Sequence, residues 1–192
     1  MKPSCILIFS GKRKCGKDFL TESLLQRIGH DKATIVRLSA PIKSHWAKSH
    51  NLDLTQLLDS SSYKEQHRLD MIHWSEEERA KDYGCFCRTA TQEAQKENKA
   101  VWIVSDARRK TDLRWFRENF GSRMKTIRVT ADDDVRSRRG WVFTKGVDDV
   151  SSECDLDDVD DWDLKVSNNG GIEELEDAVK QLTDWATRAI NS

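Results

Sequence analysis

The sequence has little proline, no long apolar run and almost no net charge. Pro3 and Pro41 are its only prolines, and no low-complexity linker or internal repeat divides the 192 residues. We therefore expect a single domain over residues 1–192 with one hydrophobic core. No segment approaches the roughly 20 apolar residues of a membrane span, and the first apolar run is too short for a secretory signal. The net charge of −1 argues against a general nucleic-acid or membrane-surface binder, which needs a large positive excess.

The cysteines also lack a pattern. There are five, an odd number, and Cys85 and Cys87 have no second pair that would complete a zinc site. Reduced thiols in a cytosolic protein are the expectation. The last four residues match no common C-terminal address signal, so the cytosol is the expected location, and the peroxisome is left open. The histidines show no metal-ligand spacing and receive no role.

Short apolar runs alternate with helical patterns along the whole chain. Runs suited to strands lie at residues 6–9, 34–39, 101–105, 126–130 and 164–167. Most segments between them have a helical pattern, and the closing segment repeats apolar residues at three- and four-residue spacing. Residues 132–139 also look helical but are almost wholly charged. This alternation predicts an α/β three-layer sandwich around a central parallel sheet of about five strands. Residues 41–97 should form a helical region beside that core.

The stretch CILIFSGKRKCGKDFL, residues 5–20, has the form of a strand, a basic glycine-spaced loop and a helix. Gly11, Gly16 and Lys17 fit the phosphate-loop (P-loop) pattern G-x-x-x-x-G-K. In such loops backbone N–H groups surround the phosphates and the lysine reaches the outer ones. The spacer residues, Lys12, Arg13, Lys14 and Cys15, add three cations. The position between a strand and a helix favours an ATP site over a chance basic turn.

Asp18 follows the loop lysine, where the general pattern has Ser or Thr as a magnesium ligand. A carboxylate could hold Mg²⁺ directly or through a water, since Mg²⁺ commonly keeps several waters. It could equally be only a favourable residue at a helix N-terminus, where the helix dipole stabilises negative charge. Both interpretations stay open at this point.

A second group of candidates follows the apolar run at residues 101–105. Asp106 stands at the end of that predicted strand, the edge where α/β sheets bind ligands, and could support magnesium or an acceptor. Arg108 and Arg109 come next, with guanidinium groups suited to phosphate or carboxylate. Cations at a helix start oppose the helix dipole, which favours a binding role over a solvated surface.

Further cations surround these two motifs. Arg136, Arg138 and Arg139, followed by a glycine-flanked loop, resemble a lid over about residues 132–148 that closes over phosphates and excludes water. The helical region supplies Lys43, Lys64, Arg68, Arg79 and Arg88, each of which alone could be a surface charge. The acidic residues Asp148, Asp149 and Glu153 could face the metal or form a solvated loop.

These cations suit a phosphotransferase whose donor and acceptor are both anionic, because close anions repel each other by several kcal/mol. Lys17, Asp18, Arg108, Arg109 and Arg139 are the candidate catalytic residues. Residue chemistry leaves two alternatives open. One is a kinase for nucleoside or deoxynucleoside monophosphates, and the other is a nucleotide-dependent binding switch without turnover.

The motifs, in order, resemble animal-type phosphomevalonate kinases. They are SGKRKCGKDF at residues 10–19, SYKE at 62–65, VSDARR at 104–109, RGWVFTKGVDD at 139–149 and SEC at 152–154. The resemblance implies a fold like that of the nucleoside monophosphate kinases. It also implies that the chain transfers the γ-phosphoryl group of ATP, with Mg²⁺, to (R)-5-phosphomevalonate in the mevalonate route to isoprenoids and sterols. No nucleic-acid or membrane partner is expected, and we expect a monomer.

The resemblance also assigns roles to residues. It implies that residues 12–18 contact the ATP phosphates and that Arg139 lies in the lid over ATP. It implies that the acceptor meets Lys43, Lys64, Arg68, Arg79, Arg88, Arg108 and Arg109, with Arg128 and Asn168 near the ligands. Two residues depart from the family pattern: Cys15 stands where Ser is usual and could make the loop sensitive to thiol reagents, and Asn169 stands where His is expected.

Overall fold

The computed structural model describes residues 2–58 and 62–192, apart from the side chains of Ser62, Lys64 and Ile172. Its centre is a five-stranded sheet in the order β2-β3-β1-β4-β5, with every neighbouring pair parallel. The strands are β1 (Cys5–Ser10), β2 (Ala33–Val36), β3 (Val101–Val104), β4 (Met124–Thr130) and β5 (Leu164–Ser167). The predicted α/β fold with a parallel sheet of about five strands is confirmed.

The central strands form because they are apolar on both sides. Every residue of β1 and of β3 is buried, as a strand covered on both faces requires. Ile6 on β1 pairs with Trp102 of β3 and with Met124 of β4. Parallel pairing brings the carboxyl ends of these strands to one edge of the sheet, where α/β folds bind ligands.

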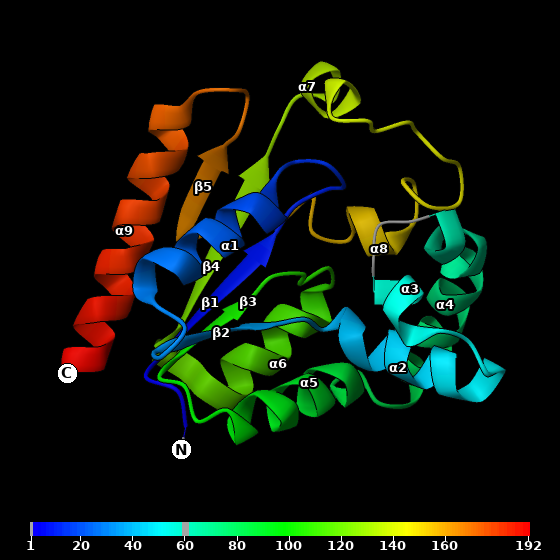
Figure 1. Cartoon of the computed structure of the whole chain (residues 1–192), viewed down its shortest axis with the longest axis horizontal. Coiled ribbons are helices and arrows are strands. Elements are labelled where there is room, and N and C mark those ends of the chain that lie inside the picture. The colour runs from blue at the N-terminus through cyan, green and yellow to red at the C-terminus, as the bar shows by residue number, and fades with distance from the viewer. Residues whose placement is uncertain (1, 59–61) are drawn as a thin grey trace.

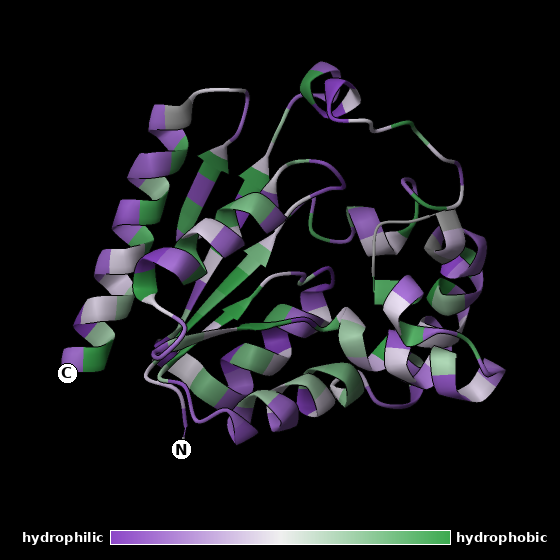
Figure 2. Cartoon of the chain, in the orientation of Figure 1, coloured by the Kyte–Doolittle hydropathy of each residue, from purple (hydrophilic) through white to green (hydrophobic). Residues whose placement is uncertain are grey.

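Two helical layers cover the sheet (Figure 1). One contains α1 (Lys17–Ile28) and α9 (Ile172–Asn191); the other contains α5 (Cys85–Lys96) and α6 (Lys110–Phe120), which the short turn η1 (Gly121–Arg123) follows. Leu7 and Phe9 of β1 point into the first layer, and Ile6 and Ile8 point into the second. Figure 2 shows the strands mostly hydrophobic and the outer helix faces mostly hydrophilic. The three-layer arrangement follows from this alternation.

A separate helical group lies beside the sheet (Figure 1). It consists of α2 (Ser39–His50), α3 (Leu54–Leu58) and α4 (Ser62–Lys81). A small core of Ala47, Leu57 and Met71 joins the three helices. The predicted region 41–97 is therefore helical, but its last helix, α5, covers the sheet instead, because Cys87 and Ala90 are buried in the main core. No helix in the described ranges is long and apolar enough to span a membrane.

The predicted strand at residues 34–39 is shorter in the structure. It ends at Val36, and α2 begins at Ser39. The reason is the Asp106 carboxylate, which accepts hydrogen bonds from the backbone N–H groups of Leu38 at 2.6 Å and Ser39 at 3.0 Å. These bonds turn the chain away from the sheet and into the helix.

The connection from β4 to β5 passes over the carboxyl edge of the sheet (Figure 1). It contains two short helices, α7 (Asp133–Arg138) and α8 (Ser151–Cys154). The helix predicted at residues 132–139 is thus confirmed as α7. The connection brings the predicted lid and the acidic residues after it close to the loop between β1 and α1.

Candidate active site

The loop between β1 and α1 approaches its neighbours closely. Lys14 and Gly16 have left-handed φ angles of 62° and 91°. A Cβ atom on Gly16 would lie 2.1 Å from Nδ2 of Asn168, and one on Gly11 would lie 2.5 Å from the carbonyl oxygen of Val129. Glycine is therefore required at both positions. A left-handed turn directly before a helix N-terminus forms a nest of N–H groups that binds anions, as the sequence pattern predicts.

Lys17 and Asp18 begin α1 at the mouth of this loop. The Lys17 side chain is buried and its Nζ lies 3.2 Å from Oδ1 of Asp18, whose own side chain is 84% exposed. Loss of hydration would raise the pKa of the Asp18 carboxyl, but the charges of Lys17, Arg108 and Arg37 lower it overall. Asp18 is therefore an ionised and accessible carboxylate, the kind of oxygen ligand that Mg²⁺ prefers.

Arg139 and Asn168 fix the backbone of the same loop with side-chain hydrogen bonds. Nη1 of Arg139 donates to the carbonyl oxygen of Cys15 at 3.2 Å, and Nη2 donates to the carbonyl oxygen of Asn168 at 2.9 Å. The buried Asn168 side chain donates to the same Cys15 carbonyl at 2.8 Å. Both predicted ligand-binding residues thus fix the loop backbone, and their contacts with a ligand stay predictions.

The other two lid arginines differ from each other. Arg136 is buried, donates through Nε to the carbonyl oxygen of Arg13 at 2.8 Å, and stacks 3.9 Å from the ring centre of Trp141. Arg138 is exposed and pairs with Asp134 on its own helix. Arg136 therefore attaches α7 to the P-loop, while Arg138 lies on the outer side.

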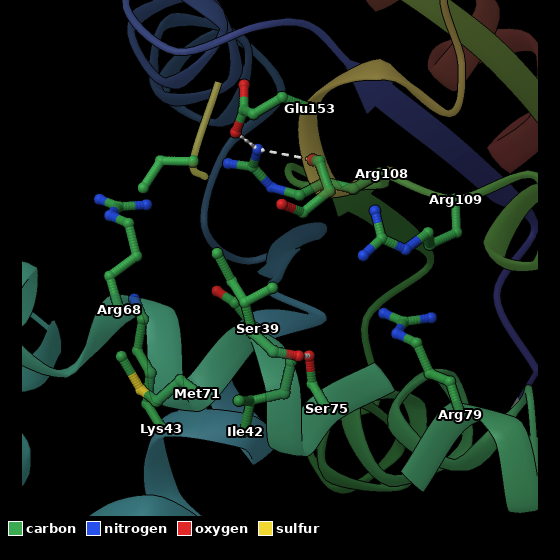
Figure 3. A pocket seen from close by; sticks show the side chains of 13 residues that line it. Ser39, Ile42, Lys43, Arg68, Met71, Ser75, Arg79, Arg108, Arg109 and Glu153 are labelled. Atoms are coloured by element: carbon green, nitrogen blue, oxygen red, sulfur yellow. Dashed lines mark hydrogen bonds and ion pairs between the residues drawn. The ribbon is translucent and has the colours of Figure 1, made fainter. Parts of the chain in front are cut away.

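A pocket opens beside the P-loop, between α2, α4 and the chain after β3 (Figure 3). The cationic side chains in its lining are Lys43, Arg68, Arg79, Arg108 and Arg109. Apolar and small polar residues form much of the remaining wall: Ser39, Ile42, Met71, Ile72, Ser75 and Val147. Figure 3 shows Arg79 and Arg109 together on one side, Lys43 and Arg68 on the other, and Arg108 between them next to Glu153.

Arg109 is the residue that most strongly indicates that this pocket binds a ligand. Its side chain is 8% exposed, and its Nη2 pairs with Glu76. Its buried Nε and Nη1 have no hydrogen-bond partner in the described part of the chain. Leaving buried donors unpaired costs about 1–3 kcal/mol each, more for charged groups, so native proteins rarely do so without a function. The pocket is therefore suited to an anion.

Asp112 positions the arginines of this pocket, although sequence reasoning gave it no role. It is fully buried, and its Oδ2 accepts the backbone N–H groups of Arg108 and Arg109, both at 3.0 Å. Its Oδ1 accepts Nη1 of Arg79 at 2.6 Å. An acidic residue in the first turn of a predicted helix was the available signal, since such residues satisfy free N–H groups there.

The pKa of Lys43 reflects both its burial and the positive charge of the pocket. Burial lowers the pKa of its ammonium group, and the charges of Arg37, Arg68 and Arg108 lower it further, whereas Asp106 opposes them. Arg37 was missed in the sequence because it fell inside the predicted strand at residues 34–39. It directly follows β2 at the ligand-binding edge, which was the signal that could have identified it.

The family follows from sequence comparison. The sequence profile described as phosphomevalonate kinase matches residues 9–122. The phosphomevalonate kinase of Drosophila melanogaster is 52% identical over 182 residues, which cover 93% of this chain and 95% of the relative. The chain belongs to the phosphomevalonate kinase family. The resemblance seen in the motifs is thereby confirmed.

Structural comparison agrees on the fold of this phosphomevalonate kinase family member. A protein of known structure from Thermus thermophilus superimposes with a TM-score of 0.54 at 17% identity, covering 95% of this chain and 98% of the other. At that identity the likeness speaks for the fold alone. The α/β architecture expected from the sequence is therefore found in a distant protein as well.

Several residues that were predicted to lie near the ligands have other contacts here. Arg88 is exposed, pairs with Asp82, and does not line the described pocket. Arg128 donates to Oγ of Ser10 at 2.9 Å and to Asp157 at 2.6 Å. Both oxygens of Asp106 accept backbone N–H groups, as described above. The side chain of Lys64 lies outside the described residues.

Acidic residues that follow the lid form ion pairs with basic residues of the P-loop. Asp157 pairs with Lys12 at 2.7 Å, and Asp148 pairs with the guanidinium group of Arg13 at 3.1 Å. Of the three spacer cations, Lys12 and Arg13 are half-buried and Lys14 is exposed. The alternative of an unpaired, solvated acidic loop is therefore wrong for Asp148.

Cys15 is buried, and burial raises the pKa of its thiol despite the nearby Lys17 ammonium. A raised pKa leaves little thiolate, the reactive form, at neutral pH. The expected sensitivity of the loop to thiol reagents is therefore not supported by its structure.

Asn169, the second residue that departs from the family pattern, accepts the backbone N–H of Asp132 at 2.8 Å and so holds the start of the lid.

We expect a thiol titration of the native enzyme at pH 8 to modify the half-buried Cys85 and Cys154 before Cys15. Cys15→Ser should leave the fast phase and the kinase activity unchanged, because Ser fills nearly the same space. Cys154→Ser is the matched control and should remove part of the fast phase. A fast phase that disappears with Cys15→Ser would show that the loop thiol is accessible.

Proposed function

We propose that this enzyme transfers the γ-phosphoryl group of Mg²⁺-bound ATP to the phosphate of (R)-5-phosphomevalonate, giving (R)-5-diphosphomevalonate and ADP. Family membership supports the reaction, and one observation carries it: the buried Arg109, with two unpaired donors, in a cation-lined pocket beside a P-loop. Such a pocket suits an acceptor that is itself an anion.

Each part of the site has a task in this reaction. The P-loop N–H groups bind the ATP phosphates, and Lys17 stabilises negative charge on the migrating phosphoryl group. An oxygen of the acceptor phosphate forms the new bond to the γ-phosphorus, while the bond from that phosphorus to the bridging oxygen breaks and ADP leaves. No general base is needed, because a phosphate oxygen is already an anionic nucleophile at neutral pH.

Asp18 is the residue that would hold magnesium. It is ionised and exposed beside Lys17, which fits a metal that binds one or two carboxylates together with substrate phosphates. When bound, the metal would neutralise phosphate charge. The contribution of Asp106 is indirect at most in our proposal, since its oxygens hold the start of α2.

Asp18→Asn should weaken the magnesium dependence of nucleotide binding while the fold is kept, because the amide keeps the size but loses the charge. Calorimetric titration of MgATP and of metal-free ATP separates the two contributions. We expect the advantage of MgATP over ATP to fall about tenfold, a typical effect for one metal-site residue. An unchanged advantage would leave Asp18 as only a favourable helix-start residue.

The two ends of phosphomevalonate fit different parts of the pocket. Its phosphate must face the P-loop, where Arg108 lies close enough to Asp18 to affect the pKa of that carboxyl. Its carboxylate would then pair with Arg109, and its methyl-bearing carbon would contact Ile42 and Met71. The lid arginines, Arg136, Arg138 and Arg139, would close over ATP and exclude water. We propose that the enzyme works as a cytosolic monomer without nucleic-acid or membrane partners.

The test is an assay of ADP release with MgATP and either phosphomevalonate or a panel of nucleoside monophosphates. Phosphomevalonate should be the preferred acceptor, and phosphorus NMR should show a new diphosphate product. Preference for a nucleoside monophosphate would favour the alternative kinase. Nucleotide binding without turnover of any acceptor would favour a binding switch.

A further inference from the structure

The Glu153 carboxylate connects the two halves of the site. Its side chain is 3% exposed, and it lies on the four-residue helix α8. Oε2 accepts the backbone N–H of Arg13, in the P-loop, at 3.1 Å. Oε1 accepts Nη1 of Arg108, in the acceptor pocket, as Figure 3 shows. One carboxylate thus binds a donor from each substrate site.

Both of these donors suit phosphate oxygens. P-loop N–H groups bind nucleotide phosphates, and an arginine beside the loop binds a transferring or accepting phosphate. A carboxylate has the same sign of charge and the same acceptor oxygens. In the ligand-free protein Glu153 therefore satisfies groups that the two substrates need, and it does so from a buried position.

A buried carboxylate is stable only while its partners compensate its charge. If a nucleotide phosphate takes the N–H of Arg13, Glu153 loses one of its two partners and meets a new negative charge, so the carboxylate is displaced and releases Arg108. Arg108 is then easier to recruit by an acceptor phosphate. The opposite order has the same consequence, because coupling between two binding sites is reciprocal.

We propose that Glu153 is a positioning residue that couples the nucleotide and acceptor sites, so that each substrate strengthens the binding of the other. This inference rests on the proposed function. Two substrates of the same charge would otherwise weaken each other by Coulomb repulsion. Glu153 offsets this repulsion, because the first substrate removes the competing carboxylate that the second would have to displace.

The neighbours of Glu153 would carry this change to the lid. The guanidinium group of Arg13 pairs with Asp148, which also accepts Nε1 of Trp141 at 3.0 Å and the backbone N–H of Thr144 at 2.8 Å. Movement of the P-loop at Arg13 therefore reaches Trp141 and Thr144 in the glycine-flanked loop of the lid.

The experiment measures the Kd of phosphomevalonate by calorimetry, with and without a non-hydrolysable ATP analogue and Mg²⁺. For the native enzyme we expect the nucleotide analogue to tighten acceptor binding by at least about fivefold, the lower end of typical coupling. Glu153→Gln keeps the size and can still accept from Arg13, but it offers no charge to Arg108. The ratio of the Kd without the nucleotide analogue to the Kd with it should fall to about one or below in this variant.

The matched control is Asp158→Asn, which removes one negative charge from the same acidic segment. Asp158 is 70% exposed and pairs with Lys110 on the surface, so the native ratio should persist. Glu153→Asp, whose shorter side chain cannot reach both donors, should give an intermediate ratio and remains available if Glu153→Gln does not fold.

Two results would overturn the inference. The first is a native ratio of one or less. The second is a Glu153→Gln ratio equal to the native one, and if the affinity for both ligands falls at the same time, Glu153 is purely structural. A native enzyme that does not bind phosphomevalonate at all would instead refute the proposed function, and this inference with it.

Discussion

Lys17→Met should lower kcat by about a thousandfold, in the range found when one preorganised charge-stabilising group is removed. The Lys17 ammonium is held at the start of α1 by burial of its side chain and by Asp18. It costs no reorganisation when charge develops on the migrating phosphoryl group, and methionine offers no charge there. The measurement is kcat at saturating MgATP and acceptor.

The fold should survive this substitution, because methionine matches the lysine stem and suits a buried position. Near-native circular dichroism and thermal unfolding would establish this. Lys14→Met is the matched control, since Lys14 is an exposed cation in the same loop, and it should lose far less activity. A folded Lys17→Met enzyme with substantial activity would contradict the role given to Lys17.

Arg109→Met should lower kcat/KM for the acceptor by about 100-fold, the cost of removing one partner of a buried charge pair, with little change in the KM for ATP. The stability cost should be small for two reasons. The partner, Glu76, is 44% exposed and stays solvated, and Asp112 holds the backbone N–H of position 109 and not its side chain. Arg108→Ala should likewise affect the acceptor more than ATP.

Arg88→Met is the control for these variants. Arg88 has the same charge but pairs with Asp82 outside the pocket, so its removal should change neither constant by more than about twofold, as for surface substitutions in general. If Arg109→Met raised the KM for ATP more than that for the acceptor, Arg109 would belong to the nucleotide site. A large effect of Arg88→Met would restore it to the acceptor site.

The sheet could be predicted because its determinants are local. β1 and β3 are continuous apolar runs, and the P-loop carries its own glycine spacing, so both can be identified from short stretches of sequence. Boundaries were less certain where a distant residue decides them. β2 ends at Val36 because Asp106, which follows β3, binds the next backbone N–H groups.

The candidate site could be predicted as a set of residue types but not as a network. The sequence identified Arg108 and Arg109, yet it could not show that Asp112 fixes both backbones. It showed an acidic segment without revealing that Glu153 reaches the P-loop, because those contacts join residues more than 100 positions apart. Pairings of this kind depend on the tertiary fold and leave no periodic signal.

The most direct test of this account is a comparison of two acceptors that differ only in the carboxylate. With phosphomevalonate and its neutral methyl ester, the native enzyme should prefer the acid by at least about 100-fold in kcat/KM, since a buried charged group would be left unpaired by the ester. In Arg109→Met that preference should nearly vanish. Equal use of both acceptors by the native enzyme, or an undiminished preference in the variant, would contradict the pocket described here.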